Sequence, residues 1–160
     1  METYDKQALL EKVRTGRAAF DALLGQFPTD GLLTAYPPDG WSVKDMMAHI
    51  AFWEDYALGR FQDAAAGKSP QADELSNEDL DRINQAILDA DPARTLAAVQ
   101  EDYECVHQEL WAALQALPDT ADDPWWDLWP QRDLPLNLMG YNTYDHYEEH
   151  ALDLRRWLAG

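Results

Sequence analysis

Apolar residues recur every three or four positions along most of this chain. That spacing is typical of one face of an α-helix. It predicts helices over about residues 5–27, 42–66, 76–90, 91–117 and 142–158. No stretch alternates between apolar and polar residues over more than a few positions, so the pattern predicts no β-strand. The sequence therefore predicts an all-α protein.

Several predicted helices begin at residues that are typical of helix starts. Ser42 is followed three positions later by Asp45, the arrangement of a capping box, and Ser76 with Asp79 repeats it. Asp91 followed by proline predicts the start of the long fourth helix. Asn142 or Thr143 is expected to cap the last helix.

The region from Asp119 to Gly140 differs from the rest of the chain. It contains three prolines, several acidic residues and the cluster Trp125-Trp126-Asp127-Leu128-Trp129-Pro130. We expect a tryptophan-rich loop with at most one short helix, packed over an edge of the core. The whole pattern predicts one domain over residues 1–160, an up-down four-helix bundle with roughly antiparallel neighbours and one additional short helix.

The charge balance excludes some classes of partner. The 160 residues include 12 Lys and Arg against 30 Asp and Glu, a formal net charge of -18. The basic residues are scattered, and only Arg155 and Arg156 are adjacent. Nucleic acids and anionic membranes are bound through clustered cations, so we expect neither partner.

Three further features predict a cytoplasmic protein. A single cysteine, Cys105, excludes an intramolecular disulfide. The N-terminal segment is charged throughout and lacks the apolar stretch of a signal peptide. No apolar run approaches the roughly 20 residues that span a bilayer.

Three of the four histidines have the spacing of a metal site. His146 and His150 lie four residues apart on the predicted last helix, so both rings project from one face. His49 lies at the edge of the apolar stripe of the second helix. Facing helices of a bundle can bring such residues together, and three imidazoles leave a position open for water or substrate. The alternatives are a solvated pair at His146 and His150 and a hydrogen-bonded core residue at His49.

The same segment also matches a zinc-protease pattern. His146-Tyr147-Glu148-Glu149-His150 fits H-x-x-E-H, the inverted zincin signature. Such proteases take a third ligand well downstream, and few residues follow His150. We therefore do not expect an inverted zincin.

Other polar residues near these histidines are candidates for catalysis. Tyr56 lies two turns after His49, where a phenol could act as acid, base or hydrogen-bond donor. Glu149 and its neighbour Glu148 could orient the imidazoles or take part in proton transfer. A packed tyrosine and a solvated acidic face are the alternatives. His107 flanks the apolar stripe of its helix and is expected at a surface or boundary position.

Two blocks of the sequence resemble a known superfamily. Gly40-Trp41-Ser42-Val43-Lys44-Asp45-Met46-Met47-Ala48-His49-Ile50-Ala51-Phe52-Trp53-Glu54 resembles a block of the DinB-like superfamily, W-S-x-x-D-x-x-x-H-x-x-x-W-E. Asn142-Thr143-Tyr144-Asp145-His146-Tyr147-Glu148-Glu149-His150, followed by Leu154-Arg155-Arg156-Trp157-Leu158, resembles its ending, N-x-x-x-H-Y-x-E-H…R-x-W-L. Within the superfamily this ending is most similar to the ClbS/DfsB family.

The resemblance implies a four-helix bundle in which His49, His146 and His150 occupy the positions of a metal triad. Members of the wider superfamily include metal-dependent thiol transferases and isomerases, commonly with zinc or nickel and often as homodimers. The ClbS-like branch is associated with hydrolytic opening of an electrophilic cyclopropane in a genotoxin. The resemblance favours such chemistry and does not identify the substrate.

Two functions of different classes follow from these observations. The first is a metal-dependent hydrolase or thiol transferase that acts on a small electrophilic or toxic molecule. Its site would be formed by His49, His146 and His150, which would hold a divalent ion, zinc or nickel, as cofactor. Tyr56 and Glu149 are the catalytic candidates. The second is a binding protein that sequesters a small hydrophobic molecule or a metal ion without turnover. A third, purely structural interpretation leaves the histidines as surface residues. A homodimer is compatible with all three.

Overall fold

The computed structural model describes residues 4–71 and 73–160, and the regular structure of these ranges is helical apart from one isolated β-bridge between Tyr36 and Trp41. The α-helices are α1 Lys6–Leu24, α2 Val43–Ala65, α3 Asn77–Ala90, α4 Leu96–Gln115, α5 Leu134–Asn142 and α6 Tyr144–Ala159. Short 3-10 helices lie in the connections at Thr29–Leu33, Asp91–Ala93 and Pro124–Leu128. The prediction of an all-α protein is confirmed.

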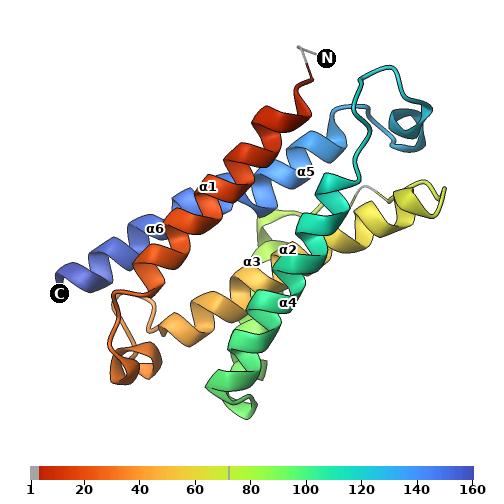
Figure 1. The fold of residues 1–160 in the computed structure, drawn as a ribbon. Helices are drawn as coiled ribbons and strands as arrows, with labels where there is room; N and C mark the ends of the chain where they lie inside the picture. The colour runs from red at the N-terminus through yellow and green to blue at the C-terminus, as the bar shows by residue number, and fades with distance from the viewer. Residues whose placement is uncertain (1–3, 72) are drawn as a thin grey trace.

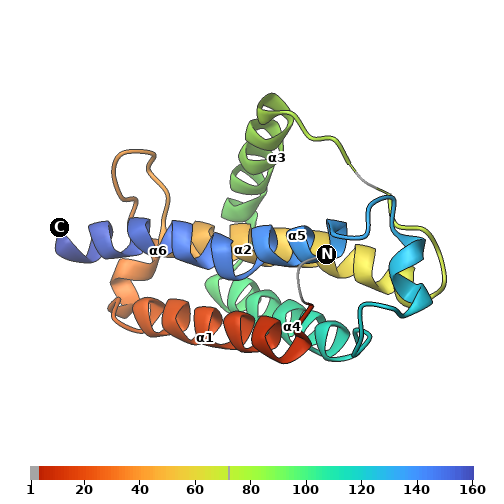
Figure 2. The same ribbon diagram turned by 90° about the horizontal axis from the view of Figure 1, so that it is seen from above.

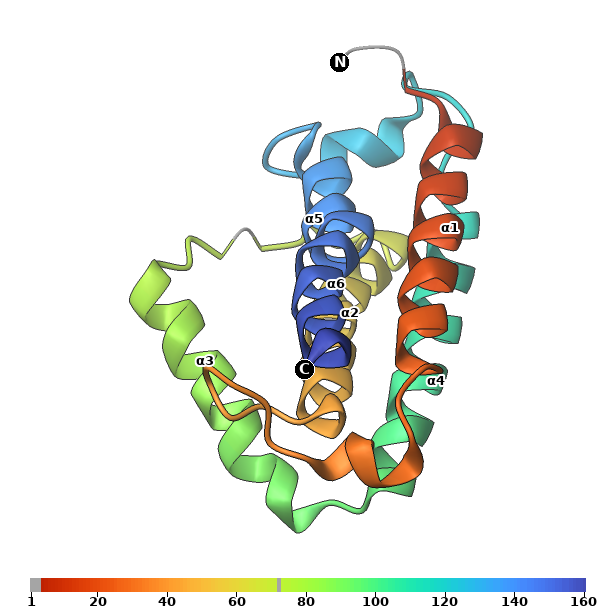
Figure 3. The same cartoon turned by 90° about the vertical axis from the view of Figure 1, so that its left-hand side faces the viewer.

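Four helical rods form the bundle, because α5 and α6 follow one another along almost the same line (Figure 1). α2 packs mainly against α4, and α1 packs mainly against α6. Figures 2 and 3 show three layers, with α3 on one side, α2 and α5–α6 in the middle, and α1 and α4 on the other side. The bundle predicted from the sequence is therefore present, with α3 as the additional shorter helix.

The sequence predicts roughly antiparallel neighbours, and the structure shows which neighbouring helices run parallel instead. Near the starts of α2 and α4, Lys44 contacts Arg94, and further along both helices Glu54 contacts His107, so α2 and α4 run parallel. α3 carries the chain from the end of α2 back towards the end of the bundle where α2 begins, so α4 can run in the same direction as α2 (Figure 1). α1 and α6 are also parallel, and the two pairs run in opposite directions (Figure 1).

Both capping boxes are present at the helix starts that the sequence predicts. The Ser42 and Ser76 hydroxyls accept hydrogen bonds from the backbone N–H groups of Asp45 and Asp79, and each carboxylate accepts one from the serine N–H. The predicted start of the fourth helix at Asp91 was wrong by one turn. α4 begins at Leu96 behind a Thr95 cap, whereas Asp91, which is buried beside Lys44, begins a 3-10 turn.

Residues 119–140 are more ordered than the loop that the sequence predicts. A 3-10 helix includes Trp126, which is fully buried and donates its indole N–H to the Thr120 carbonyl at 2.9 Å. From Leu134 the chain forms α5, with Pro135 in its first turn, where proline is tolerated. The backbone turns away from helical geometry only at Thr143, with φ -130° and ψ -106°, and α6 follows.

Two groups of buried apolar side chains fill the bundle, one towards each end. The first contains residues from α1, α2, α4 and α6, namely Phe20, Met46, Ile50, Val99, Tyr103, Tyr147 and Leu154. The second contains Val13, Phe61, Leu110, Leu114, Trp129 and Met139. Among the described residues, no helix is long and apolar enough to cross a lipid bilayer.

α3 forms one wall of the space that contains the candidate site and contributes no fully buried residue, among those described, to the core. Its half-buried apolar residues, Leu80, Ile83 and Ile87, lie on the side that approaches α2. The helix leans away from the other rods (Figures 2 and 3). This geometry leaves space between α3, α2 and α5–α6, and that space contains the candidate site.

Candidate metal centre

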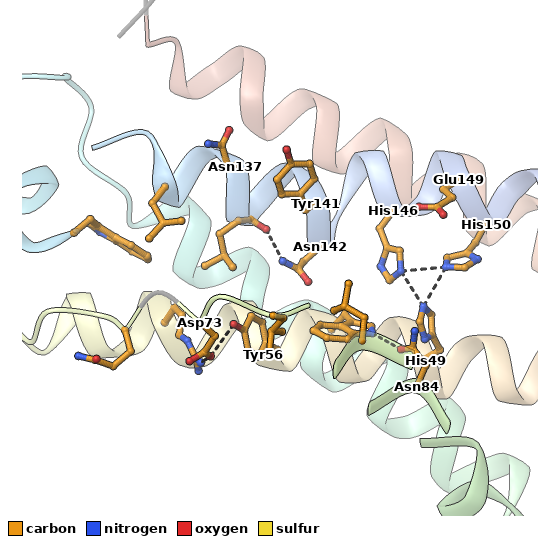
Figure 4. Close-up of a pocket in the computed structure, with 18 of the residues that line it drawn as sticks. His49, Tyr56, Asp73, Asn84, Asn137, Tyr141, Asn142, His146, Glu149 and His150 are labelled. Carbon is orange, nitrogen blue, oxygen red and sulfur yellow. Dashed lines mark hydrogen bonds and ion pairs between the residues drawn. The ribbon is translucent and has the colours of Figure 1, made fainter. Parts of the chain in front are cut away.

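His49 on α2 meets His146 and His150 on α6 with all three Nε2 atoms directed at one point (Figure 4). The Nε2 atom of His49 lies 2.9 Å from that of His146 and 3.1 Å from that of His150, and the latter two are 3.1 Å apart. The four-residue spacing places both rings of α6 on one face. α2 crosses that face of α6 in the opposite direction, and His49 lies on α2 where it completes a triangle of nitrogens.

The triangle fits a cation better than it fits three hydrogen bonds. A hydrogen bond between two ring nitrogens needs one donor and one acceptor, so three nitrogens in mutual contact can form at most two such bonds. The Nδ1 atoms of His49 and His146 are buried and have no hydrogen-bond partner among the described residues. Three imidazole nitrogens that face one another are a common ligand set for zinc and for nickel.

Burial keeps two of these rings neutral. It lowers the pKa of His49 to about 2, with further lowering by His146 and His150, and lowers the pKa of His146 to about 3, with a contribution from His150. A metal ligand must be the unprotonated imidazole. At neutral pH, therefore, protons do not compete for the Nε2 atoms of these two residues.

The third ring has a carboxylate partner that the sequence interpretation missed. His150 Nδ1 lies 3.1 Å from Asp153 Oδ2, and Arg156 Nη2 lies 3.2 Å from the other oxygen of Asp153. A carboxylate on Nδ1 fixes the tautomer that presents Nε2 to a metal. The signal in the sequence is the three-residue spacing from His150, whereas the acids considered there, Glu148 and Glu149, are exposed.

Two aromatic side chains border the triad. The ring centroid of Trp41 lies 5.1 Å from that of His49 and 6.4 Å from that of His150. Trp53, one turn after His49, donates its indole N–H to the Asn84 side chain on α3 at 3.0 Å. The latter bond ties α3 to α2 close to the triad (Figure 4).

The triad opens onto a pocket of about 640 Å³ between α3, α2 and α5–α6. Such a volume suits a drug-sized molecule. The aromatic side chains in its wall are Trp41, Trp53, Tyr56, Trp129 and Tyr141, and its amides include Asn84, Asn137 and Asn142. The charged residues are Arg60 and Asp73, which pair with one another, and Glu149. Most of the pocket surface is therefore apolar, and the histidines are among several polar groups in its wall.

Tyr56 lines the pocket away from the histidines (Figure 4). Its hydroxyl donates to Asp73 Oδ2 at 2.8 Å, and the Arg60 guanidinium stacks on its ring at 4.2 Å from the centroid. Burial, followed by the hydrogen bond to Asp73, raises the pKa of Tyr56. Its geometry suits a neutral hydrogen-bonding group in the wall rather than a base at the triad.

Glu149 lies on α6 between the two histidine ligands, with its side chain exposed at the edge of the pocket (Figure 4). It forms no hydrogen bond to a described side chain of the triad. Glu149 does not orient the imidazoles, and it remains a candidate for exchanging a proton with a bound molecule.

An antiparallel pair of bundle helices, α2 and α6, presents three histidines to this pocket, which is the arrangement from which helical bundles build metal sites. The model of the DinB superfamily matches residues 12–153, and the chain belongs to this superfamily. Its members often bind metal ions, and His49, His146 and His150 all lie within the matched range. Comparisons with the curated proteins and with the solved structures gave no match.

Proposed function

We propose that this protein is a metal-dependent enzyme, a hydrolase or thiol transferase, that acts on a small uncharged electrophile. The observation that supports the proposal most strongly is the triangle of Nε2 atoms, with sides of 2.9–3.1 Å, in the wall of a mainly apolar pocket. The expected cofactor is zinc or nickel held by His49, His146 and His150. The similarity of the C-terminal motif to the ClbS/DfsB family supports hydrolytic opening of a strained ring as the reaction.

A divalent ion at the triad would supply Lewis acidity and would lower the pKa of a water or thiol that reaches it. The protein residues supply the surroundings for that chemistry. Burial keeps His49 and His146 neutral, and Asp153 holds the orientation of His150. The aromatic wall gives the apolar part of the substrate a surface to pack against and so helps to position it. Glu149 at the edge is the group available to accept a proton, and Tyr56 is a hydrogen-bonding group for the remote part of the substrate.

The charge of the pocket supports an uncharged substrate. Arg60 is the one cationic side chain in the described wall, and it is paired with Asp73. The chain as a whole carries a formal charge of -18. An anionic substrate would be repelled by the surface and would find no unpaired cationic side chain in the described wall, so the proposed metal ion would be its one positive partner there.

Product analysis tests this proposal. Zinc- or nickel-loaded protein is incubated with a panel of neutral epoxides, cyclopropanes and activated alkenes, with and without a thiol, and the products are measured by mass spectrometry. Hydrolysis adds the mass of one water to the electrophile, and transfer adds the mass of the thiol; His49→Gln should abolish either product. Quantitative recovery of bound but unchanged ligand would instead support sequestration without turnover.

A further inference from the structure

Glu54 is a fully buried carboxylate at the position where all four rods of the bundle meet. It lies on α2, five residues after His49, and its exposed fraction is 0%. Each of the other three rods sends one polar side chain to it: Arg17 from α1, His107 from α4 and Tyr147 from α6. Apolar packing does not favour a carboxylate at a fully buried position, so the role of Glu54 lies in these polar contacts.

The contacts to Glu54 satisfy both of its oxygens. Arg17 Nη1 lies 3.3 Å from Oε1 and from Oε2, and His107 Nδ1 lies 3.1 Å from Oε1. The Tyr147 hydroxyl donates to the same Oε1 atom. His107, predicted at a surface or boundary position, is thus a partly buried member of this group. Buried charges often add little stability compared with apolar residues, and their best-attested use is to fix the register of packed helices.

The Tyr147–Glu54 hydrogen bond links the same two stretches of chain that carry the triad. Tyr147 directly follows His146 and precedes His150 by three residues, and Glu54 follows His49 on α2. α2 packs mainly on α4, and α6 packs mainly on α1, so the backbones of α2 and α6 approach closely at few described positions. The relative placement of the three histidines therefore rests on the packing of α2 against α5 and on side-chain links between α2 and α6.

We propose that Glu54 and Tyr147 are positioning residues of the metal centre: their hydrogen bond sets the register of α6 against α2 and thereby brings His49 into reach of His146 and His150. The inference rests on the proposed metal-binding function. Metal–nitrogen distances tolerate only about 0.2 Å of error, so a small slip of α6 along α2 separates the ligands. Loss of the tyrosine hydroxyl should therefore weaken metal binding although no ligand has been changed.

A second tyrosine in the same network provides a matched control. The Tyr103 hydroxyl donates to Asp21 Oδ1 at 2.6 Å and so links α4 to α1, neither of which carries a triad histidine. Tyr103 and Tyr147 are almost equally buried, with exposed fractions of 2% and 1%. Tyr103→Phe and Tyr147→Phe each remove one hydrogen bond from a buried tyrosine to a carboxylate, and only the second loosens α6 from α2.

The test compares wild type, Tyr147→Phe and Tyr103→Phe by zinc affinity in competition with a chelating dye, by the visible spectrum of bound Co²⁺ and by thermal melting. Both variants should melt at lower temperature than wild type. Tyr147→Phe should bind zinc at least tenfold more weakly and change the Co²⁺ spectrum, as expected for loss of a group that supports ligands. Tyr103→Phe should stay within twofold of wild type with the same spectrum.

Equal affinities for wild type and Tyr147→Phe, or equal weakening in both variants, would overturn the positioning role. Absence of zinc binding by wild type would instead overturn the proposed function, so the two failures are distinguishable. Should Tyr147→Phe fail to fold, Glu54→Gln takes its place with the same expected and contrary results, because it weakens the same hydrogen bond and keeps the side-chain volume.

Discussion

His150 and Asp153 form a histidine–carboxylate pair on α6, with Nδ1 3.1 Å from Oδ2. The carboxylate can accept a hydrogen bond from Nδ1–H, and in that tautomer of the neutral ring Nε2 carries no proton and faces the Nε2 atoms of His49 and His146. Arg156 holds the other oxygen of Asp153 at 3.2 Å. One turn of helix therefore supplies both a ligand and the group that orients it.

Asp153→Asn should weaken metal binding without preventing it. An amide can present either its oxygen or its NH₂ group to Nδ1, so the tautomer of His150 is no longer fixed. Changes at such supporting residues typically cost 10–100-fold in metal affinity. Zinc titration checks the change, and Asp145→Asn, an exposed carboxylate of the same helix, is the control. Unchanged affinity in Asp153→Asn would contradict the orienting role.

The two buried histidines should make the metal-free protein less stable as the pH falls. Their folded-state pKa values, about 2 for His49 and about 3 for His146, lie below the ordinary value near 6.5. Unfolded chains therefore bind protons at these residues that folded chains do not. Their favourable contribution is complete above about pH 6.5 and is lost progressively as the pH falls below that value.

Proton uptake on unfolding measures this effect directly. At pH 5, wild type should take up about two more protons on unfolding than the His49→Gln/His146→Gln double variant. Calorimetry in two buffers of different ionisation enthalpy gives the number. Equal uptake by the two proteins would show that these histidines are already protonated in the folded state.

How much of the site the sequence predicts depends on how far apart its parts lie along the chain. The four-residue spacing of His146 and His150 predicts a shared face, and the position of His49 on an apolar stripe predicts that it points inward. Asp153 could have been found by the same helical spacing. The partners of Glu54 could not, because Arg17, His107 and Tyr147 reach it from three other helices, and periodicity within a helix carries no information about register between helices.

The fold shows the same division between local and long-range information. Capping boxes at Ser42 and Ser76 fixed two helix starts, because those hydrogen bonds are local. The prolines and acidic residues of the region favoured a loop, yet α5 forms there because Pro135 occupies the first turn and Met139 is buried in the core. The parallel course of α2 and α4 depends on α3, which carries the chain back between them, and that arrangement is a tertiary property.

Lys44 is expected to secure the corner between α3 and α4. Its ammonium group donates to the carbonyls of Asp91 and Arg94 at 2.7 and 2.5 Å and lies 3.4 Å from Asp91 Oδ2. Lys44→Met leaves the buried Asp91 carboxylate without its cation, which should cost about 3 kcal/mol of unfolding free energy at pH 7. Lys68→Met, at an exposed lysine, should cost close to nothing.

The loss in Lys44→Met should shrink at low pH. Burial, together with the neighbouring Asp45, raises the pKa of Asp91 to about 6, so at pH 5 this carboxyl is mostly neutral and needs no cation. Urea unfolding at pH 7 and pH 5 checks the difference. A loss that is equal at the two pH values would contradict the assignment of Asp91 as the partner that matters.

Trp41 should report metal binding. Its ring centroid lies 5.1 Å from that of His49. Quenching of tryptophan fluorescence by a paramagnetic ion falls steeply with the distance between the ring and the ion. Addition of Ni²⁺ should reduce tryptophan fluorescence in wild type, and Trp41→Phe should remove most of that response. Trp125→Phe, in the 3-10 helix, should retain it. A response that is lost in Trp125→Phe and kept in Trp41→Phe would place the ion elsewhere.

The central claim is that His49, His146 and His150 together hold one divalent ion. Metal analysis of protein purified without a histidine tag, before and after equilibration with zinc or nickel, tests it most directly. The account predicts about one equivalent per chain in wild type and almost none in His49→Gln, which leaves only the pair on α6. Less than about a tenth of an equivalent in wild type after equilibration, or equal loading of wild type and His49→Gln, would contradict it.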